Sequence, residues 1–168
     1  MTLRPDLRTG TCAFRLMPDD AMTTAESSVA LTRIGPVVVS LAYEWIHPDD
    51  GPQQGVLLVG GGPEGQGPDD ADASAEQVAI TVAWADSWHQ QPGLRTLHGT
   101  RAGGHVDVSA TYAGDWGWTV ELDGLDAAGE APITMVMRNV VPESARDMLP
   151  EGAQTGAYDV MLARWGSE

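Results

Sequence analysis

The chain has 168 residues and a formal net charge of −15, from 9 basic and 24 acidic side chains. All the basic residues are arginine, so Schiff-base chemistry and a phosphate-loop lysine are excluded. This negative charge argues against binding to nucleic acids or anionic membranes, because phosphate binding needs clustered positive charge. The length predicts a single domain over residues 1–168.

Cys12 is the only cysteine, which excludes an intramolecular disulfide and a cysteine-based zinc site. The segment 1–10 contains Arg4, Asp6 and Arg8 and has no apolar stretch, so it does not resemble a secretory signal. We therefore expect a cytoplasmic protein without a membrane partner. With 42% hydrophobic residues and six tryptophans, the chain can build a core.

Alternation of inward and outward side chains predicts about ten short strands. In chain order they cover residues 11–16, 29–34, 37–45, 54–59, 78–88, 94–99, 106–112, 116–122, 133–139 and 158–164. Most are separated by turn signals such as Gln91-Pro92-Gly93 and Asp123-Gly124. No segment of helical length lies between them, so parallel β-α-β units are not expected.

Sequential antiparallel strands avoid exposed edges best when the sheet closes on itself. We therefore predict an all-β fold, a single antiparallel up-and-down β-barrel of about 8–10 strands. Residues 1–9 would form an N-terminal arm, and the Gly-, Pro- and Asp-rich segment 60–76 a flexible acidic loop. Residues 142–149 predict one short helix that covers an end of the barrel.

Two motifs in the acidic loop do not carry a function. Gly60, Gly62 and Gly65 match the spacing of a dinucleotide-binding turn, but proline and acidic residues follow where a helix is required. The acidic residues at 69–76 lack the spacing of a twelve-residue calcium loop. Both observations favour a solvated loop.

The four histidines do not form a zinc-binding motif, and no metal is predicted. His89 and His98 flank a turn and could meet with an acid to hold zinc or iron, but surface or hydrogen-bonded histidines are the favoured interpretation. No G-x-S-x-G nucleophile motif is present. Asp86 and His89 can pair only if the chain bends after Trp88, because positions three apart on a straight strand face opposite sides.

Three polar residues interrupt apolar strand faces: Asp86, Asn139 and Arg164. A buried charge needs a partner or a shifted pKa, so we expect an Asp86–Arg164 ion pair near one end of the barrel. The pair could be structural, or its residues could lie beyond the rim in water. Alternatively these are polar groups in an apolar pocket, where tryptophans could raise the pKa of Asp86 as a general acid.

Four segments, 84–89, 97–99, 116–118 and 135–142, together resemble an uncharacterised bacterial family catalogued as a domain of unknown function. Its members are similar to calycins, which are lipocalin-like antiparallel barrels. The resemblance covers roughly residues 9–165. The matching residues are Tyr43, Trp45, Gly55, Trp84, Asp86, His89, Gly99, Tyr112, Trp116, Trp118, Met137, Asn139 and Pro142.

The resemblance implies a calycin/lipocalin-like barrel with an interior ligand site, and supplies no reaction. Related haem-binding barrels carry a histidine on the final strand, and residues 158–165 contain none. We therefore predict no cofactor.

The function predicted first is binding of a small, largely apolar molecule in a lumen lined by aromatic and methionine side chains. The expected ligand-binding residues are Tyr43, Trp45, Trp84, Trp88, His98, Trp118, Met135, Met137, Asn139 and Arg164. The alternative is a cofactor-independent isomerase or cyclase of natural-product type, with Asp86 and His89 as acid and base. A third reading is an interaction protein whose acidic surface binds a basic partner, and a homodimer stays open.

Overall fold

The computed structural model describes residues 4–35, 37–60, 77–89, 93–126, 131–149 and 154–166. It contains ten antiparallel strands and one short 3₁₀ helix. The strands are β1 (Asp6–Phe14), β2 (Thr23–Ile34), β3 (Val38–His47), β4 (Gly51–Val59), β5 (Val78–Asp86), β6 (Arg95–Ala102), β7 (His105–Tyr112), β8 (Trp116–Asp123), β9 (Ile133–Val141) and β10 (Gly156–Trp165), and the helix is η1 (Glu143–Met148).

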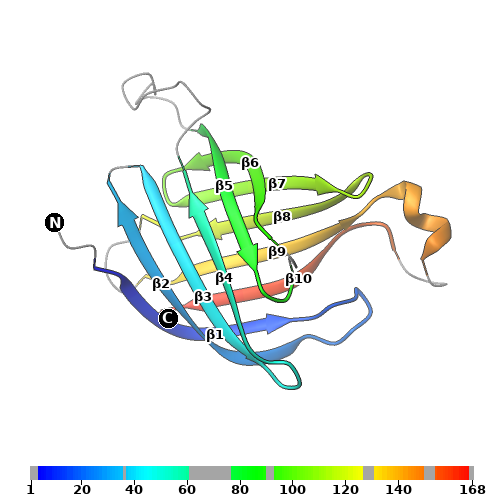
Figure 1. Cartoon of the computed structure of the whole chain (residues 1–168), viewed down its shortest axis with the longest axis horizontal. Coiled ribbons are helices and arrows are strands. Elements are labelled where there is room, and N and C mark those ends of the chain that lie inside the picture. The colour runs from blue at the N-terminus through cyan, green and yellow to red at the C-terminus, as the bar shows by residue number, and fades with distance from the viewer. Residues whose placement is uncertain are drawn as a thin grey trace.

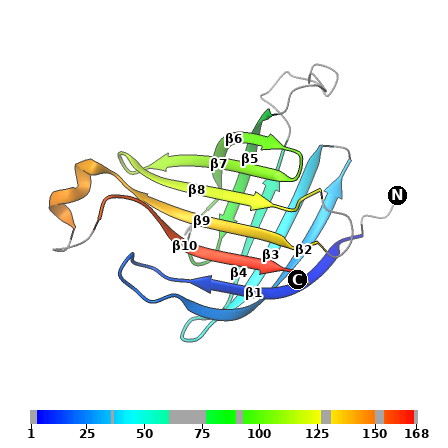
Figure 2. The ribbon, with the colours of Figure 1, turned by 180° about the vertical axis from the view of Figure 1, so that it is seen from behind.

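Each strand pairs with its neighbours in the sequence, and β1 also pairs with β10, so the sheet is a closed barrel. This confirms the predicted all-β barrel, and every predicted strand overlaps one in the structure. Figures 1 and 2 show β2–β5 on one side of the barrel, crossing the direction of β7–β10 on the other. The architecture is consistent with a calycin/lipocalin-like barrel.

Because the strands form a meander, the ends of β1, β3, β5, β7 and β9 lie at the same end of the barrel. We call this the His89 end, since His89 follows β5 there. It includes the turn at 48–50, the turn at 113–115 and η1. Figure 1 shows η1 projecting beyond β9 and β10.

Two glycines allow neighbouring strands to approach closely. A Cβ on Gly10 of β1 would lie 1.9 Å from the carbonyl oxygen of Arg164 on β10, where the barrel closes. A Cβ on Gly99 of β6 would lie 2.0 Å from the carbonyl oxygen of Asp107 on β7. No side chain fits at either position, because the backbone of the neighbouring strand occupies the space.

The segments flanking the strands differ in part from the predictions. β1 begins at Asp6, inside the expected N-terminal arm of residues 1–9, because residues 6–9 pair with β2. The predicted helix at 142–149 is a 3₁₀ helix of six residues, Glu143–Met148. Of the predicted flexible loop 60–76, residues 61–76 lie outside the described residues.

The inward faces of the strands form one continuous hydrophobic core. The alternation in β3 and β5 is as predicted, with Val39, Leu41, Val82 and Trp84 all buried. On β9, Met135 and Met137 are fully buried. Burial of this much apolar surface supplies the main driving force for closing the barrel.

The final strand departs from strict alternation. Its register shifts between Asp159 and Met161, so the adjacent residues Val160 and Met161 are both buried. An extra residue in a strand reverses the inward and outward positions beyond it. Arg164 therefore faces outward and is exposed, and the predicted Asp86–Arg164 ion pair is wrong.

Within the described ranges, no helix combines the length and the apolar character needed to cross a membrane.

Candidate functional site

Asp86 is the last residue of β5 and its side chain is completely buried. One carboxylate oxygen, Oδ1, accepts hydrogen bonds from the backbone N–H groups of Trp88 at 2.8 Å and His89 at 2.6 Å. The other, Oδ2, accepts a hydrogen bond of 2.6 Å from the Tyr43 hydroxyl. Three hydrogen bonds thus offset the cost of burying this charge.

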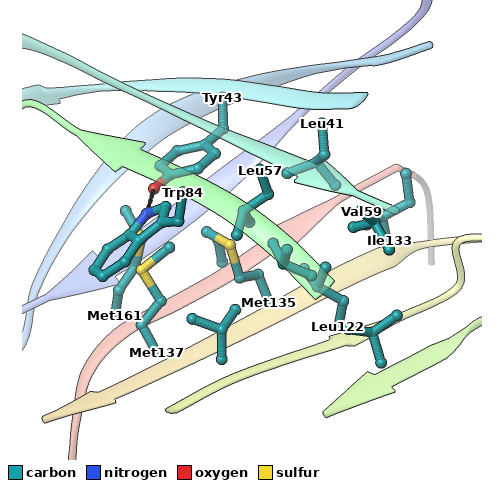
Figure 3. Packing of buried hydrophobic residues seen from close by; sticks show 14 of the residues in the cluster. Leu41, Tyr43, Leu57, Val59, Trp84, Leu122, Ile133, Met135, Met137 and Met161 are labelled. Atoms are coloured by element: carbon teal, nitrogen blue, oxygen red, sulfur yellow. Dashed lines mark hydrogen bonds between the residues drawn. The ribbon is translucent and has the colours of Figure 1, made fainter. Parts of the chain in front are cut away.

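Tyr43 reaches Asp86 across β4, and Gly55 makes this contact possible. Gly55 pairs with Tyr43 on one side and with Asp86 on the other. A Cβ at Gly55 would lie 2.1 Å from the Tyr43 ring. The Tyr43 hydroxyl also accepts a hydrogen bond of 3.2 Å from the indole N–H of Trp84, as Figure 3 shows.

His89 lies beside this carboxylate because the chain bends after β5. The sequence predicted that Asp86 and His89 could pair only if the chain bends here. With this bend, Nδ1 of His89 lies 3.4 Å from Oδ1 of Asp86. The His89 side chain is 1% exposed. Among the described residues, neither ring nitrogen has a hydrogen-bond partner. Nδ1 therefore has only its charge contact with Asp86, and Nε2 has no polar partner among the described residues.

Aromatic rings surround His89 at this end of the barrel. Its ring centroid lies 4.7 Å from that of Trp88, 5.8 Å from that of Trp45 and 6.0 Å from that of Trp118. The indole N–H of Trp45 is also buried and has no partner among the described residues. Two unpartnered polar groups thus lie on neighbouring rings.

Trp88 lies between this cluster and the solvent-exposed turn that joins β3 and β4. Its ring is half-buried and contacts Phe14 edge-on, with the ring centroids 5.5 Å apart. Its centroid lies 5.2 Å from that of His47. The indole N–H donates a hydrogen bond of 3.1 Å to the exposed Asp50 carboxylate in the β3–β4 turn. Among the described residues, the Trp88 side chain is therefore held by ring packing and by a hydrogen bond near solvent.

A row of polar side chains forms part of the rim at the same end. The Tyr112 hydroxyl donates to Oδ1 of Asn139 at 3.0 Å, and Nδ2 of Asn139 donates to the Tyr158 hydroxyl at 3.3 Å. The guanidinium of Arg95 lies 5.0 Å from the Tyr112 ring centre, and that of Arg15 lies 5.8 Å from the Tyr158 ring centre. Asn139 is thus a half-buried rim residue whose amide already has two partners.

Burial and neighbouring groups shift the pKa values of Asp86, Tyr43 and Cys12. Burial raises the pKa of Asp86, but the His89 imidazole, the Tyr43 hydroxyl and the His89 backbone N–H lower it more, so the net shift is downward. The expected rise in the pKa of this carboxyl is therefore wrong. Burial, and then the Asp86 charge, raise the pKa of Tyr43 well above its usual value and that of Cys12 to about 12. At neutral pH, Asp86 is charged while Tyr43 and Cys12 keep their protons.

Most of the predicted ligand-binding residues face the barrel interior or the His89 end. Six are buried in the core: Tyr43, Trp45, Trp84, Trp118, Met135 and Met137. Trp88 and Asn139 are half-buried at the His89 end.

His98 and Arg164 do not belong to this set. Both are exposed on the outer wall, and Nδ1 of His98 lies 3.4 Å from the Thr81 hydroxyl. The suggested zinc or iron site that joins His89 and His98 is therefore wrong. In the described ranges, no group of three or more His, Cys, Asp or Glu side chains could hold a metal ion.

Sequence reasoning missed Phe14 and His47 as contributors to the cluster, and it named Gly55 only as part of the family resemblance, without its role in the Tyr43–Asp86 contact. Gly55 interrupts an apolar strand, a signal that often marks close approach of another group. Phe14 and His47 end their strands, and only the barrel topology brings them next to Trp88.

A hollow of about 1000 Å³ lies along the barrel wall beside the Tyr43–Asp86 contact, and its lining includes Tyr43, Gly55 and Asp86. The lining also includes the outward-facing Ala30, Ala42 and Val56, and His89 does not contribute to it. The site around His89 is instead closed by packed rings.

No protein-family model and no curated protein matches this chain.

Proposed function

We propose that the protein is a small-molecule-binding barrel whose ligand binds at the His89 end. The observation that supports this most directly is the His89 imidazole, 1% exposed with neither ring nitrogen hydrogen-bonded among the described residues. Leaving a buried polar group unpaired costs about 1–3 kcal/mol. A ligand that hydrogen-bonds to His89 would recover this loss.

The surroundings of His89 indicate the chemistry of such a ligand. The nearest rings are Trp45, Trp88 and Trp118, which offer apolar faces to a flat molecule. The unpartnered Trp45 indole can only donate a hydrogen bond. We expect a small, mainly apolar ligand that carries at least one hydrogen-bond acceptor.

Entry of the ligand requires Trp88 to move. The ring nitrogens of His89 are buried, and Trp88 packs directly against the imidazole. Trp88 follows the end of β5, and its one side-chain hydrogen bond to a described residue goes to the exposed Asp50. Rotation of this side chain would open a path to His89 while the barrel wall stays intact.

The test is calorimetric titration of the protein with three probes: phenol, benzimidazole and benzylacetone. We expect saturable binding of at least one probe with Kd below about 1 mM. The variant His89→Leu keeps the apolar bulk and removes both nitrogens, so we expect it to bind at least about tenfold more weakly. Because it also removes the Nδ1 contact with the buried Asp86 carboxylate, we expect it to lose about 1–3 kcal/mol of stability, and circular dichroism checks that it stays folded during the titration.

The matched control is His98→Leu, which changes an exposed histidine on the outer wall. It should bind each probe as the unaltered protein does. Equal affinity in His89→Leu and the unaltered protein would exclude this site, and the absence of saturable binding for every probe would exclude the proposed function.

A further inference from the structure

We infer that His89 is a general base toward the bound ligand, that Asp86 positions it, and that the reaction is enolisation of a small apolar ketone. This inference rests on the proposed ligand site and adds an activity to it. Three features support it: a fixed carboxylate, an imidazole held beside that carboxylate, and an unused hydrogen-bond donor nearby.

The fixed carboxylate is Asp86. Hydrogen bonds from the Tyr43 hydroxyl and from the backbone N–H groups of Trp88 and His89 fix both of its oxygens. Neither oxygen is exposed, so the carboxylate has no role in direct contact with solvent. Its negative charge acts on the neighbouring imidazole instead.

The second feature is the direction of the His89 ring. Nδ1 faces the carboxylate at 3.4 Å, so the negative charge favours a proton on this nitrogen. In a neutral imidazole the other nitrogen, Nε2, then carries the lone pair. Nε2 is buried and unpartnered among the described residues, which leaves it available to a ligand. Carboxylate–histidine pairs elsewhere orient a general base in the same manner.

The third feature is the Trp45 indole N–H. It is buried and unpartnered, and its ring centroid lies 5.8 Å from that of His89. A base beside a donor is the pair of groups that enolisation requires, since a proton leaves carbon while negative charge develops on oxygen.

The balanced step involves no co-reactant. Nε2 of His89 accepts the proton from the carbon next to the carbonyl, and the C–H electron pair forms the enolate double bond. The carbonyl oxygen gains the negative charge and accepts a hydrogen bond from Trp45. Return of a proton from the imidazolium to the same carbon regenerates the ketone, and its transfer to the oxygen gives the isomeric enol, in both cases without oxidation or reduction.

Other described groups near Asp86 are less suited to this role. The Cys12 thiol and the Tyr43 hydroxyl lie in the core and keep their protons at neutral pH. Tyr43 also already donates its proton to Asp86. Among the described groups near Asp86, His89 therefore has the unused lone pair that a base requires.

The experiment uses benzylacetone in deuterium oxide and follows exchange of the hydrogens next to the carbonyl by proton NMR. We expect the protein to accelerate exchange at least tenfold over buffer, with saturation as benzylacetone increases. His89→Gln should reduce the rate to that of buffer, and Trp45→Phe should lower it severalfold. His98→Gln should exchange benzylacetone as fast as the unaltered protein.

A second measurement reads the tautomer of His89 by nitrogen NMR without any ligand. We expect the proton on Nδ1 in the unaltered protein and a mixture of tautomers in Asp86→Asn. This spectroscopic change distinguishes positioning from a purely structural role.

The outcomes separate the two proposals. If benzylacetone binds but exchanges equally fast with His89→Gln, the enolisation is wrong and the binding site stands. If phenol or benzimidazole binds while benzylacetone does not, the ketone class is wrong. A proton on Nε2 of His89 would overturn the assigned base. If no probe binds, both proposals fail.

Discussion

Cys12 illustrates how the barrel interior changes the chemistry of a single residue. Its side chain is fully buried on β1, and burial raises its pKa to about 12, with a further contribution from the Asp86 charge. Because the thiolate is the reactive form, the folded protein keeps this thiol unreactive across the neutral range. Cys12 is thus a core residue rather than a nucleophile.

We predict that dithiobis(nitrobenzoate) does not label Cys12 in the folded protein at about pH 8, where a free thiol is partly ionised. Labelling should reach one thiol per chain once denaturant unfolds the barrel. As a control, Thr111→Cys adds an exposed thiol on β7, and one label per folded chain is expected. Rapid labelling of Cys12 in the native protein would show that β1 and β10 separate readily.

At the scale of single residues, the sequence located Asp86 correctly but misidentified its partner. An acid on a tryptophan-rich strand face was recognisable from the alternation in residues 78–88. Its actual partners are the Tyr43 hydroxyl and two backbone N–H groups. The backbone donors arise from a bend after β5, which strand periodicity does not encode.

At the scale of elements, β4 leaves room for a side chain of β3 to reach a side chain of β5. Gly55 pairs with both Tyr43 and Asp86, and the Tyr43 ring occupies the volume that a side chain at Gly55 would fill. The nearest atoms to a Cβ at Gly55 all belong to the Tyr43 side chain. A substitution there should act through Tyr43 rather than through the backbone.

We predict that Gly55→Ala destabilises the protein by about 1–3 kcal/mol, because the Tyr43 ring must shift to avoid overlap. Tyr43→Leu should also destabilise it, since it removes ring packing and the hydrogen bond to Asp86. The double variant should lose less stability than the sum of the two, with a coupling of about 0.5–3 kcal/mol. Denaturant unfolding of all four proteins measures this, and additive effects would contradict the assigned role of Gly55.

Most strands were predictable because they follow an alternation that burial on one face imposes, as in β3, β5 and β7. β10 shows what the pattern cannot reveal. Its register shift after Asp159 places Arg164 outside, whereas uninterrupted alternation from Tyr158 places Arg164 inside. A bulge is set by pairing with β9 and β1, so information from a single strand is insufficient.

At the scale of the whole molecule, the closed meander explains why the candidate site lies at one end. Odd-numbered strands end there, and their final residues supply Phe14, His47, Asp86 and Tyr112. These residues are distant in sequence, so composition and spacing alone could not bring them together. The net charge of −15 argued against a nucleic-acid or anionic-membrane surface but left the interior chemistry open.

The central claim is that a small apolar molecule binds against His89 at this end of the barrel. The most direct measurement is NMR of the protein with isotope-labelled histidine rings, titrated in turn with phenol, benzimidazole and benzylacetone. We predict that the His89 ring signals shift saturably with at least one probe, while those of the outer-wall residues His98 and His105 stay unchanged. Shifts at His98 or His105 with none at His89, or no saturable shift with any probe, would contradict the account.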